Sequence, residues 1–343
     1  NHGVPLELRT DTCCNSSWTN SDIRDQRTGF SISPKPCDIK MTSALIRKIS
    51  KGRPFEWACP SDGRSAPFFI IGSGRSGTTL LRRLLLDDPA ICIPAEHPGV
   101  RLAYLRFARA RWILNWPRVV DMTLASLEYH RAFDDWEIGN LSKLSRSLGK
   151  VAPDQRSFGH IIDSVFRTEC GVDRSGLWGD KTPALSDDAK LLLSVFPDAR
   201  FVHLVRDGVD VVESLVRAGL ANSRGEAATR WVRRVTNAEA MIEHCKPGHG
   251  IRVTYEDLVQ RPLDIVNTIR AIVDLQAISS LEESTMGLER VSDVRSRAHH
   301  RRVFEPLNDT SIGRGRRVIS SGERHAIGVI ANRTLTAMGY SPV

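Results

Sequence analysis

The sequence predicts an α/β protein with a P-loop-containing fold, in which helices flank a central parallel sheet to give three layers. An apolar run at 68–71 leads into a glycine-rich turn and then into a helical pattern, which is the order of a phosphate-binding loop. A second apolar run at 199–205 is also followed by a helical pattern. Because the predicted strands alternate with helices, parallel pairing is expected.

The predicted strands are short and apolar, and residues that favour turns bound them. The first lies between Pro67 and Gly72, as is typical of a strand buried on both faces of a parallel sheet. In chain order, strands are expected at 68–71, 90–95, 199–205 and 251–254.

The predicted helices carry apolar residues three and four positions apart. Pro89 follows the first helix, Pro197 follows the fourth, and Pro117 interrupts the second, because proline disrupts a helix interior. In chain order, helices are expected at 78–87, 98–130, 157–170, 185–196, 207–218, 226–245, 263–275 and 322–338. Gly339 follows the last helix, at a position typical of a helix end.

The composition favours a globular protein with anionic partners. Of 343 residues, 41% are hydrophobic and 26% charged, which supports a sizeable core and excludes wholesale disorder. The formal net charge of +8 favours a nucleotide, a nucleic acid, an acidic glycan or a membrane surface. We expect no nucleic acid partner, because no known binding module is recognised. We expect no membrane segment either, because no apolar run approaches the roughly 20 residues needed.

Residues 1–65 differ from the rest of the chain in composition and in hydrophobic pattern. They are rich in Ser, Thr, Asp and Cys and have few periodic apolar stretches, which predicts an irregular N-terminal extension. Residues 66–343 are expected to form the main domain.

The seven cysteines show no spacing typical of a structural metal site. Cys92, Cys170 and Cys245 are scattered through the main domain, and we expect them to be buried thiols of a reduced protein. The other four lie within the first 60 residues, where an oxidising compartment would let them pair.

The first motif is the segment 72–79, which reads Gly-Ser-Gly-Arg-Ser-Gly-Thr-Thr. Its glycines let successive N–H groups point into one concavity, and the positive end of the next helix completes an oxyanion site. The spacing from Gly72 to Gly77 matches a Walker A loop, but Thr78 stands where a nucleoside triphosphatase carries lysine. This argues against ATPase or kinase chemistry, and Arg75 supplies a cation instead.

The second motif joins Arg206, at the end of the strand 199–205, to Ser214 on the following helix. Ligands of open parallel sheets bind at the carboxyl ends of strands, where a guanidinium can hold a phosphate with two hydrogen bonds. The helix has to fold back for both side chains to reach one phosphate. The structural alternative is an ion pair between Arg206 and Asp207.

Together the two motifs resemble the sulfotransferase superfamily, whose members use 3′-phosphoadenosine-5′-phosphosulfate (PAPS). The resemblance extends over about residues 67–340 and implies that 66–343 is a sulfotransferase domain. It places the 3′-phosphate at Arg206 and Ser214. It places the 5′-phosphosulfate at Ser73, Gly74, Arg75, Ser76, Gly77, Thr78 and Thr79.

The chain resembles the tyrosylprotein sulfotransferases and the related bacterial-type group more than the cytosolic phenol and steroid enzymes. Arg75 begins an Arg-Ser-Gly-Thr-Thr segment in which the cytosolic enzymes have lysine first. Glu96 lies 21 residues later, where the tyrosylprotein enzymes place their catalytic glutamate. Lys181, within Gly-Asp-Lys-Thr-Pro, resembles the lysine that supports the transferring group.

Two later segments extend the resemblance. Tyr255, within Val-Thr-Tyr-Glu-Asp-Leu, resembles the tyrosine that lies near the nucleotide. Arg314 and Arg316 resemble a late basic segment that closes over the phosphates, although many relatives have an aromatic residue where Gly315 stands.

The resemblance implies an in-line transfer of the sulfuryl group to an acceptor hydroxyl, with no metal. Glu96 is the expected general base, and Arg75 and Lys181 are expected to stabilise charge. His97 is the rival base, since cytosolic relatives use histidine. An ion pair with Asp180 is the structural alternative for Lys181.

The acceptor is left open among protein tyrosine, carbohydrate, lipid and small phenol, with the first two favoured. The tract Arg295–Arg302 has four arginines and two histidines. It is either a solvated loop or an electropositive rim for an acidic peptide or glycan. Trp112, Trp116 and Trp136 are expected in the core, and their segment is also a candidate lining for the acceptor site.

Two other functions are weighed against this one. A P-loop kinase or other NTPase is disfavoured by Thr78, and a non-catalytic nucleotide-binding protein of the same fold is disfavoured by Arg75, Glu96 and Lys181 together. We expect a cytoplasmic location, with the Golgi lumen and a removed anchor as the alternative. The sequence does not indicate an oligomeric state.

Overall fold

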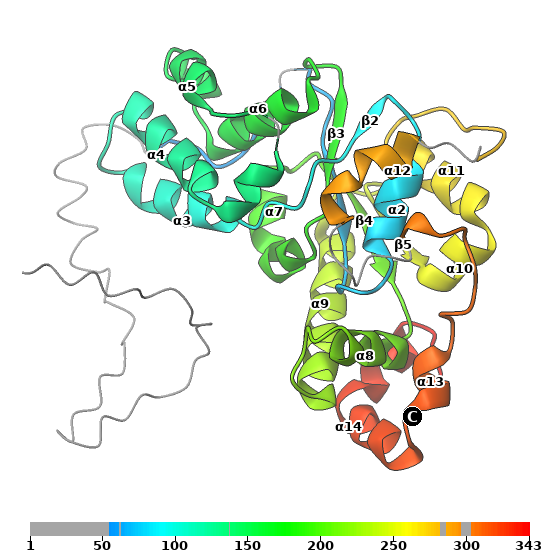
Figure 1. The fold of residues 1–343 in the computed structure, drawn as a ribbon. Coiled ribbons are helices and arrows are strands. Elements are labelled where there is room, and N and C mark those ends of the chain that lie inside the picture. The colour runs from blue at the N-terminus through cyan, green and yellow to red at the C-terminus, as the bar shows by residue number, and fades with distance from the viewer. Residues whose placement is uncertain (1–54, 62, 137, 282–285, 296–302) are drawn as a thin grey trace, which may run out of the picture. The chain divides into compact units, whose positions relative to one another are not determined.

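A computed structural model describes residues 55–343, apart from 62, 137, 282–285 and 296–302 (Figure 1). The described residues belong to one compact unit, Gly52–Val343. Most of the predicted extension 1–65, and all of the tract Arg295–Arg302 except Arg295, lie outside them. No helix in the described part of the chain is both long enough and apolar enough to cross a membrane.

The described residues form a five-stranded parallel sheet with the order β2-β3-β1-β4-β5. The strands are β1 Phe68–Ile71, β2 Ile91–Cys92, β3 Leu177–Asp180, β4 Arg200–Val205 and β5 Gly250–Thr254. The central strand β1 pairs with β4 from Phe68↔Arg200 to Ile71↔His203 and with β3 at Phe68↔Gly179. The predicted α/β fold with a parallel sheet is confirmed.

Helices cover both faces of the sheet, with α3, α4, α6 and α7 on one face and α2, α11 and α12 on the other (Figure 1). The helices are α2 Thr78–Leu85, α3 Val100–Ala110, α4 Trp116–Glu128, α5 Ser142–Leu148, α6 Phe158–Cys170, α7 Ala189–Val195, α8 Gly208–Arg217, α9 Arg224–His244, α10 Tyr255–Gln260, α11 Pro262–Ile272, α12 Met286–Arg290, α13 Arg314–Val318 and α14 Ser321–Ala337.

The alternation of side chains along β1 explains why its sequence is apolar throughout. Phe69 and Ile71 join the core on the α3–α4–α6 face, whereas Phe68 and Ile70 join the core on the α2–α11 face. All four are buried. A strand with two buried faces favours apolar side chains at successive positions.

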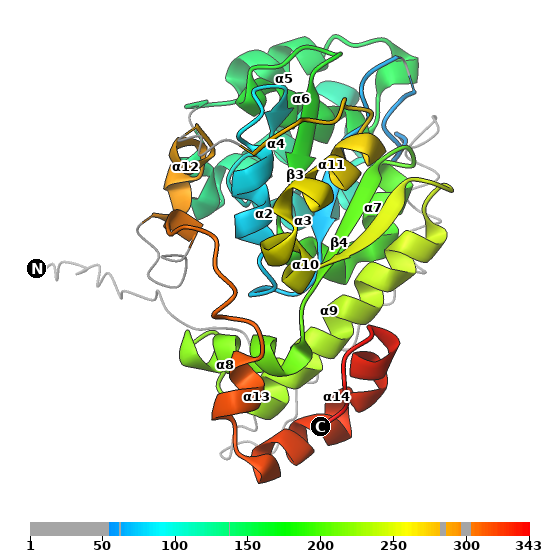
Figure 2. The same cartoon turned by 90° about the vertical axis from the view of Figure 1, so that its right-hand side faces the viewer.

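A third apolar core lies beyond the sheet, where α8, α9 and α14 meet. The long helix α9 starts at an N-cap, where Ser223 accepts a hydrogen bond from the Glu226 N–H. Figure 2 shows α9 running from the sheet towards α8, α13 and α14. The indole of Trp231 lies at the centre of this core, so α8 is held beside the end of the sheet.

The predicted strand 90–95 is shorter than expected, because only Ile91 and Cys92 pair with β3. Pro94 has no N–H to donate. Two arginine side chains hydrogen bond to backbone carbonyls of this segment. Arg290 donates to Ile91 O at 2.6 Å, and Arg82 donates to Ile93 O at 2.9 Å.

Two predicted helices are divided. The stretch 98–130 breaks at 111–115, before Pro117, which lies in the first turn of α4; there a missing N–H costs no helical hydrogen bond. The stretch 185–196 consists of a 3₁₀ turn, Pro183–Asp188, followed by α7. The turn is fixed by Ser186, whose hydroxyl accepts from the Gly72 N–H at 2.9 Å.

The prediction that Cys92 and Cys170 are reduced thiols is wrong, because they form a disulfide. The bond joins β2 to the last residue of α6, 78 residues further along the chain. Their spacing gives no hint of pairing, since it depends on how α6 packs beside the sheet. Cys245 is a free thiol.

Replacing Cys92 and Cys170 together by serine is expected to lower the free energy of unfolding by about 2–4 kcal/mol, because the bond restricts the unfolded chain. Urea denaturation of the oxidised protein and of the variant measures this difference. Cys245→Ser is the matched control, and reductant should destabilise the wild type but not the double variant. Equal midpoints for the oxidised wild type and the double variant would contradict the assignment.

Candidate functional site

Every strand of the described sheet delivers a polar segment to the same edge. β1 leads into the loop 72–77, β3 is followed by Lys181, β4 by Arg206 and β5 by Tyr255. Glu96 lies four residues after the end of β2. Since the strands are parallel, their carboxyl ends meet where ligands of open α/β sheets bind.

A cavity of about 380 Å³ opens at this edge, within the range of small-molecule sites. The predicted site residues that line it are Gly74, Arg75, Gly77, Thr78, Thr79, Glu96, Arg206, Ser214, Tyr255 and Arg314. Those that do not line it are Ser73, Ser76, Lys181 and Arg316. The sequence analysis did not single out five polar lining residues, which are Glu213, Arg217, Arg230, Arg234 and Ser311.

The phosphate loop has the backbone of an anion site. Gly77 is the N-cap of α2 with φ +94°, and as a glycine it has no side chain that could cap this helix end. The first N–H groups of α2 therefore have no capping partner from a side chain, and the helix end attracts an anion. A Cβ at Gly77 would lie 2.5 Å from the ring of Tyr255, so only glycine lets that ring pack against the loop. Arg75 has φ +71°, a conformation rare outside glycine.

Helix α8 folds back so that Ser214 reaches the loop. Arg75 Nε donates to Ser214 Oγ at 3.2 Å, and Arg206 Nη1 donates to Arg75 O at 3.4 Å. The guanidinium of Arg206 stacks on Tyr255, with its carbon 4.3 Å from the ring centroid. The two motifs thus form one contiguous surface.

The guanidinium of Arg206 is buried, and only some of its N–H groups have hydrogen-bond partners among the described residues. It forms an ion pair with Asp210 at 3.2 Å, and not with Asp207, the partner considered in the sequence analysis. Its Nη2 also donates to Ser311 O at 2.6 Å, while its Nε has no partner among the described residues. A buried donor without an acceptor is costly, and a phosphate oxygen of a nucleotide would satisfy it. The residues present therefore fit an anionic ligand.

Glu96 and Lys181 form an ion pair at the wall of the cavity. Lys181 is buried and also donates to Thr79 Oγ1 at 3.3 Å, which links it to the phosphate loop. Burial lowers the pKa of Lys181, and the charge of Glu96 opposes this shift. Lys181 pairs with Glu96 rather than with Asp180, which accepts from Thr182 at 2.8 Å. Burial raises the pKa of Asp180 to about 7.

His97 points away from the cavity and is fully buried. Its ring centroid lies 4.6 Å from that of Trp136, and neither ring nitrogen has a partner among the described residues. Burial lowers the pKa of His97 to about 4. Trp116 and Trp136 are also buried, and neither they nor Trp112 line the cavity.

Asp210 holds the late basic segment against α8. Its carboxylate accepts from the N–H groups of Gly313 at 2.8 Å and Gly315 at 2.6 Å. A Cβ at Gly315 would lie 2.4 Å from Val209 O, which explains why this chain has no aromatic residue there. Ser311 and Arg314 reach the cavity in this arrangement.

Arg316 faces away from the cavity. Its guanidinium pairs with Asp207 at 2.6 Å and donates to the carbonyl of Ser341. This side chain therefore joins α13 to the C-terminal residues.

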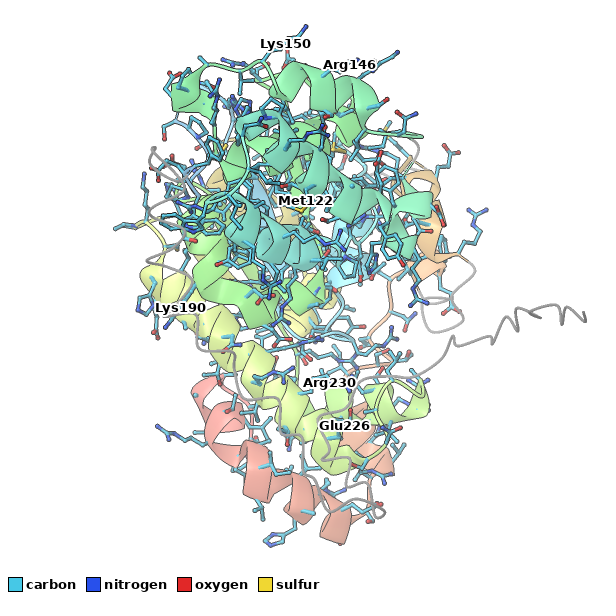
Figure 3. All side chains as sticks on the ribbon, turned by 90° about the vertical axis from the view of Figure 1, so that its left-hand side faces the viewer. Met122, Arg146, Lys150, Lys190, Glu226 and Arg230 are labelled. Carbon is cyan, nitrogen blue, oxygen red and sulfur yellow. A yellow bond between two sulfur atoms is a disulfide. The ribbon has the colours of Figure 1, made fainter. Side chains whose placement is uncertain are left out.

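The arginines that the sequence analysis missed come from α8 and α9. Arg230 and Arg234 are four residues apart on α9, so both lie on one face of the helix. Arg230 pairs with Glu226 and donates to Leu220 O at 2.7 Å; Figure 3 labels both residues on α9. Their spacing is a signal in the sequence, but only the packing of α9 shows which face meets the cavity.

His97→Leu is expected to weaken the pH dependence of stability between pH 6.5 and 4. The folded state disfavours the imidazolium, so over this window the unfolded chain binds a proton that the folded protein excludes. The wild-type free energy of unfolding therefore falls as pH drops from 6.5 towards 4. Urea denaturation at several pH values measures the difference between variant and wild type. Parallel curves for the two proteins would contradict the assignment.

Comparison with known proteins gives a match to a family model and several distant relatives. The model described as the sulfotransferase family matches residues 67–279. An uncharacterized protein of Aquifex aeolicus is 25% identical over 218 residues, which cover 61% of this chain and 25% of that protein. A putative protein-tyrosine sulfotransferase of Caenorhabditis briggsae is 24% identical over 217 residues, which cover 61% of this chain and 65% of that protein. The chain thus spans less than two thirds of these relatives.

Among solved structures, the sulfotransferase domain of the Synechococcus PCC 7002 olefin synthase has a similar fold. The TM-score is 0.53 at 20% sequence identity, and the match covers 78% of this chain and 93% of that domain. This likeness supports the fold.

Proposed function

The chain belongs to the sulfotransferase family, and from this premise we propose that it moves the sulfuryl group of PAPS to an acceptor hydroxyl. The observation that carries the proposal is one cavity lined by the phosphate loop, by Arg206 with Ser214, and by Glu96. Such a cavity offers an anion site for each end of the donor and a carboxylate for the acceptor.

We assign the 5′-phosphosulfate of the donor to the loop 73–79 and its 3′-phosphate to Arg206 and Ser214. The open N-terminus of α2 favours the first group, and Arg75, whose Nε donates to Ser214 Oγ, lies between the two sites. Arg206 and Ser214 both line the cavity and suit the second. Tyr255 and Arg314 complete the wall, whereas Arg316 contributes through α13 rather than by contact.

Glu96 accepts the proton of the acceptor hydroxyl as its oxygen bonds to sulfur. The bond from sulfur to the bridging phosphate oxygen breaks, and adenosine 3′,5′-bisphosphate leaves. Lys181 orients Glu96 through their ion pair and contacts the loop through Thr79. Arg75 and Lys181 supply fixed positive charge where negative charge develops, and the proposal assigns no step to a metal ion.

The acceptor we favour is a protein tyrosine or a carbohydrate hydroxyl within an acidic peptide or glycan. The Caenorhabditis briggsae relative, a putative protein-tyrosine sulfotransferase, supports tyrosine. Among the described residues, six arginines and two glutamates line the cavity, and this excess of positive charge complements an anionic acceptor. The kinase or NTPase alternative is not favoured, because Thr78 starts α2 where a Walker loop needs lysine.

The disulfide between Cys92 and Cys170 bears on the compartment. Disulfides persist in oxidising compartments and are rare in the cytosol. We therefore propose the Golgi lumen ahead of the cytoplasmic location that the sequence suggested. We also propose residues 66–343 as the catalytic domain.

Titration with adenosine 3′,5′-bisphosphate is expected to raise the melting temperature, because the ligand binds only the folded protein. At 100 times the dissociation constant the stabilisation is about 2.7 kcal/mol. Differential scanning fluorimetry measures the shift, with ATP and magnesium as the matched titration. A shift with ATP and magnesium alone would reject the proposal in favour of a kinase or NTPase.

Glu96→Gln is expected to lower kcat by about 10²–10⁴-fold, because the amide cannot take the acceptor proton. Affinity for the bisphosphate should change little. Turnover is followed as bisphosphate release with a panel of tyrosine peptides and glycans. Glu243→Gln, on the exposed side of α9, is the control for loss of a carboxylate. Near-normal turnover of Glu96→Gln would remove Glu96 as the base.

A further inference from the structure

Arg234 of α9 is a cation that neither motif accounts for, and it lies directly against the phosphate loop. Its Nη1 is 3.7 Å from the position that a Cβ of Gly74 would occupy. It lines the cavity, and its side chain is only 17% exposed. The neighbouring Arg233 is 58% exposed and does not line the cavity.

The hydrogen bonds of Arg234 leave donors available. Its Nε donates to Asp187 Oδ2 at 3.5 Å, and within the described residues neither Nη1 nor Nη2 has a hydrogen-bond partner. Burial lowers the pKa of Arg234, and the charge of Asp187 opposes that shift. A guanidinium held out of water with two free nitrogens is well suited to bind an oxyanion.

The surroundings of Arg234 identify which end of the donor it meets. Asp187 follows Ser186, which holds the start of the loop through hydrogen bonds with the backbone of Gly72. This 3₁₀ turn comes directly after the strand end that carries Lys181. Arg234 is therefore anchored to the same segments as the loop and the Glu96–Lys181 pair, whereas the 3′-phosphate residues come from β4 and α8.

We propose that Arg234 is a further catalytic residue, whose Nη1 and Nη2 hydrogen bond the 5′-phosphosulfate beside the loop amides. The inference rests on the proposed sulfotransferase function and adds to it. Arg234 neutralises charge on the leaving phosphate as the sulfur–oxygen bond breaks. Asp187 positions it by sharing its carboxylate between Arg233 and Arg234.

The test compares Arg234→Gln with Arg233→Gln, because both side chains pair with Asp187 but only Arg234 lines the cavity. Two ligands are titrated by calorimetry: adenosine 3′,5′-bisphosphate, and adenosine 3′-monophosphate, which lacks the 5′-phosphate. Arg234→Gln is expected to weaken the bisphosphate by about 10- to 100-fold and to leave the monophosphate within twofold. Arg233→Gln should leave both affinities unchanged.

Three results would overturn the proposal. An equal loss of affinity for both nucleotides in Arg234→Gln would indicate that Arg234 has a structural role. Unchanged bisphosphate affinity with a raised KM for the acceptor would make it an acceptor contact. A wild-type protein that binds neither nucleotide would reject the proposed function itself. If Arg234→Gln does not fold, Arg234→Lys, which keeps the charge, replaces it. This lysine variant is expected to bind the bisphosphate with an affinity between that of the wild type and that expected for the glutamine variant.

Discussion

The site depends on the parallel pairing of β1 with both β3 and β4. This pairing brings the carboxyl ends of three strands to one edge, and β2 and β5 extend that edge on either side. A close approach makes it possible, since a Cβ at Gly179 would lie 2.5 Å from the ring of Phe68. The loop, Lys181 and Arg206 are neighbours because of this register, although more than 100 residues separate the first two.

The cavity concentrates positive charge, and the fold provides carboxylates that pair with several of its cations. Arg206 pairs with Asp210, Arg234 with Asp187 and Lys181 with Glu96, while Arg230 forms a more exposed pair with Glu226. Breaking one partner of a buried pair leaves an uncompensated charge, so these carboxylates are part of the site even where they do not face the ligand. Groups held in place before the ligand arrives need little reorganisation, which is the condition for electrostatic catalysis.

The local parts of the fold and site were predictable because their signals lie close together in the sequence. The loop 72–79 is marked by its glycines between an apolar strand and a helix, and Arg206 by its place after another strand. The strand β3 was not among the predicted strands, since four residues reading Leu-Trp-Gly-Asp carry neither alternation nor an apolar run. The disulfide was missed because Cys92 and Cys170 are brought together only when α6 packs beside the sheet.

The sequence by itself determined the α/β class, the phosphate loop and the family, because glycine placement and short apolar runs act through local backbone geometry. Tertiary structure alone decided which cations meet the cavity. Arg234 faces it while Arg233 points to solvent, and Arg314 lines it while Arg316 binds Asp207. In each pair the residue type is the same and only the helix face differs. That face is set by packing against distant elements, which the order of residues does not specify.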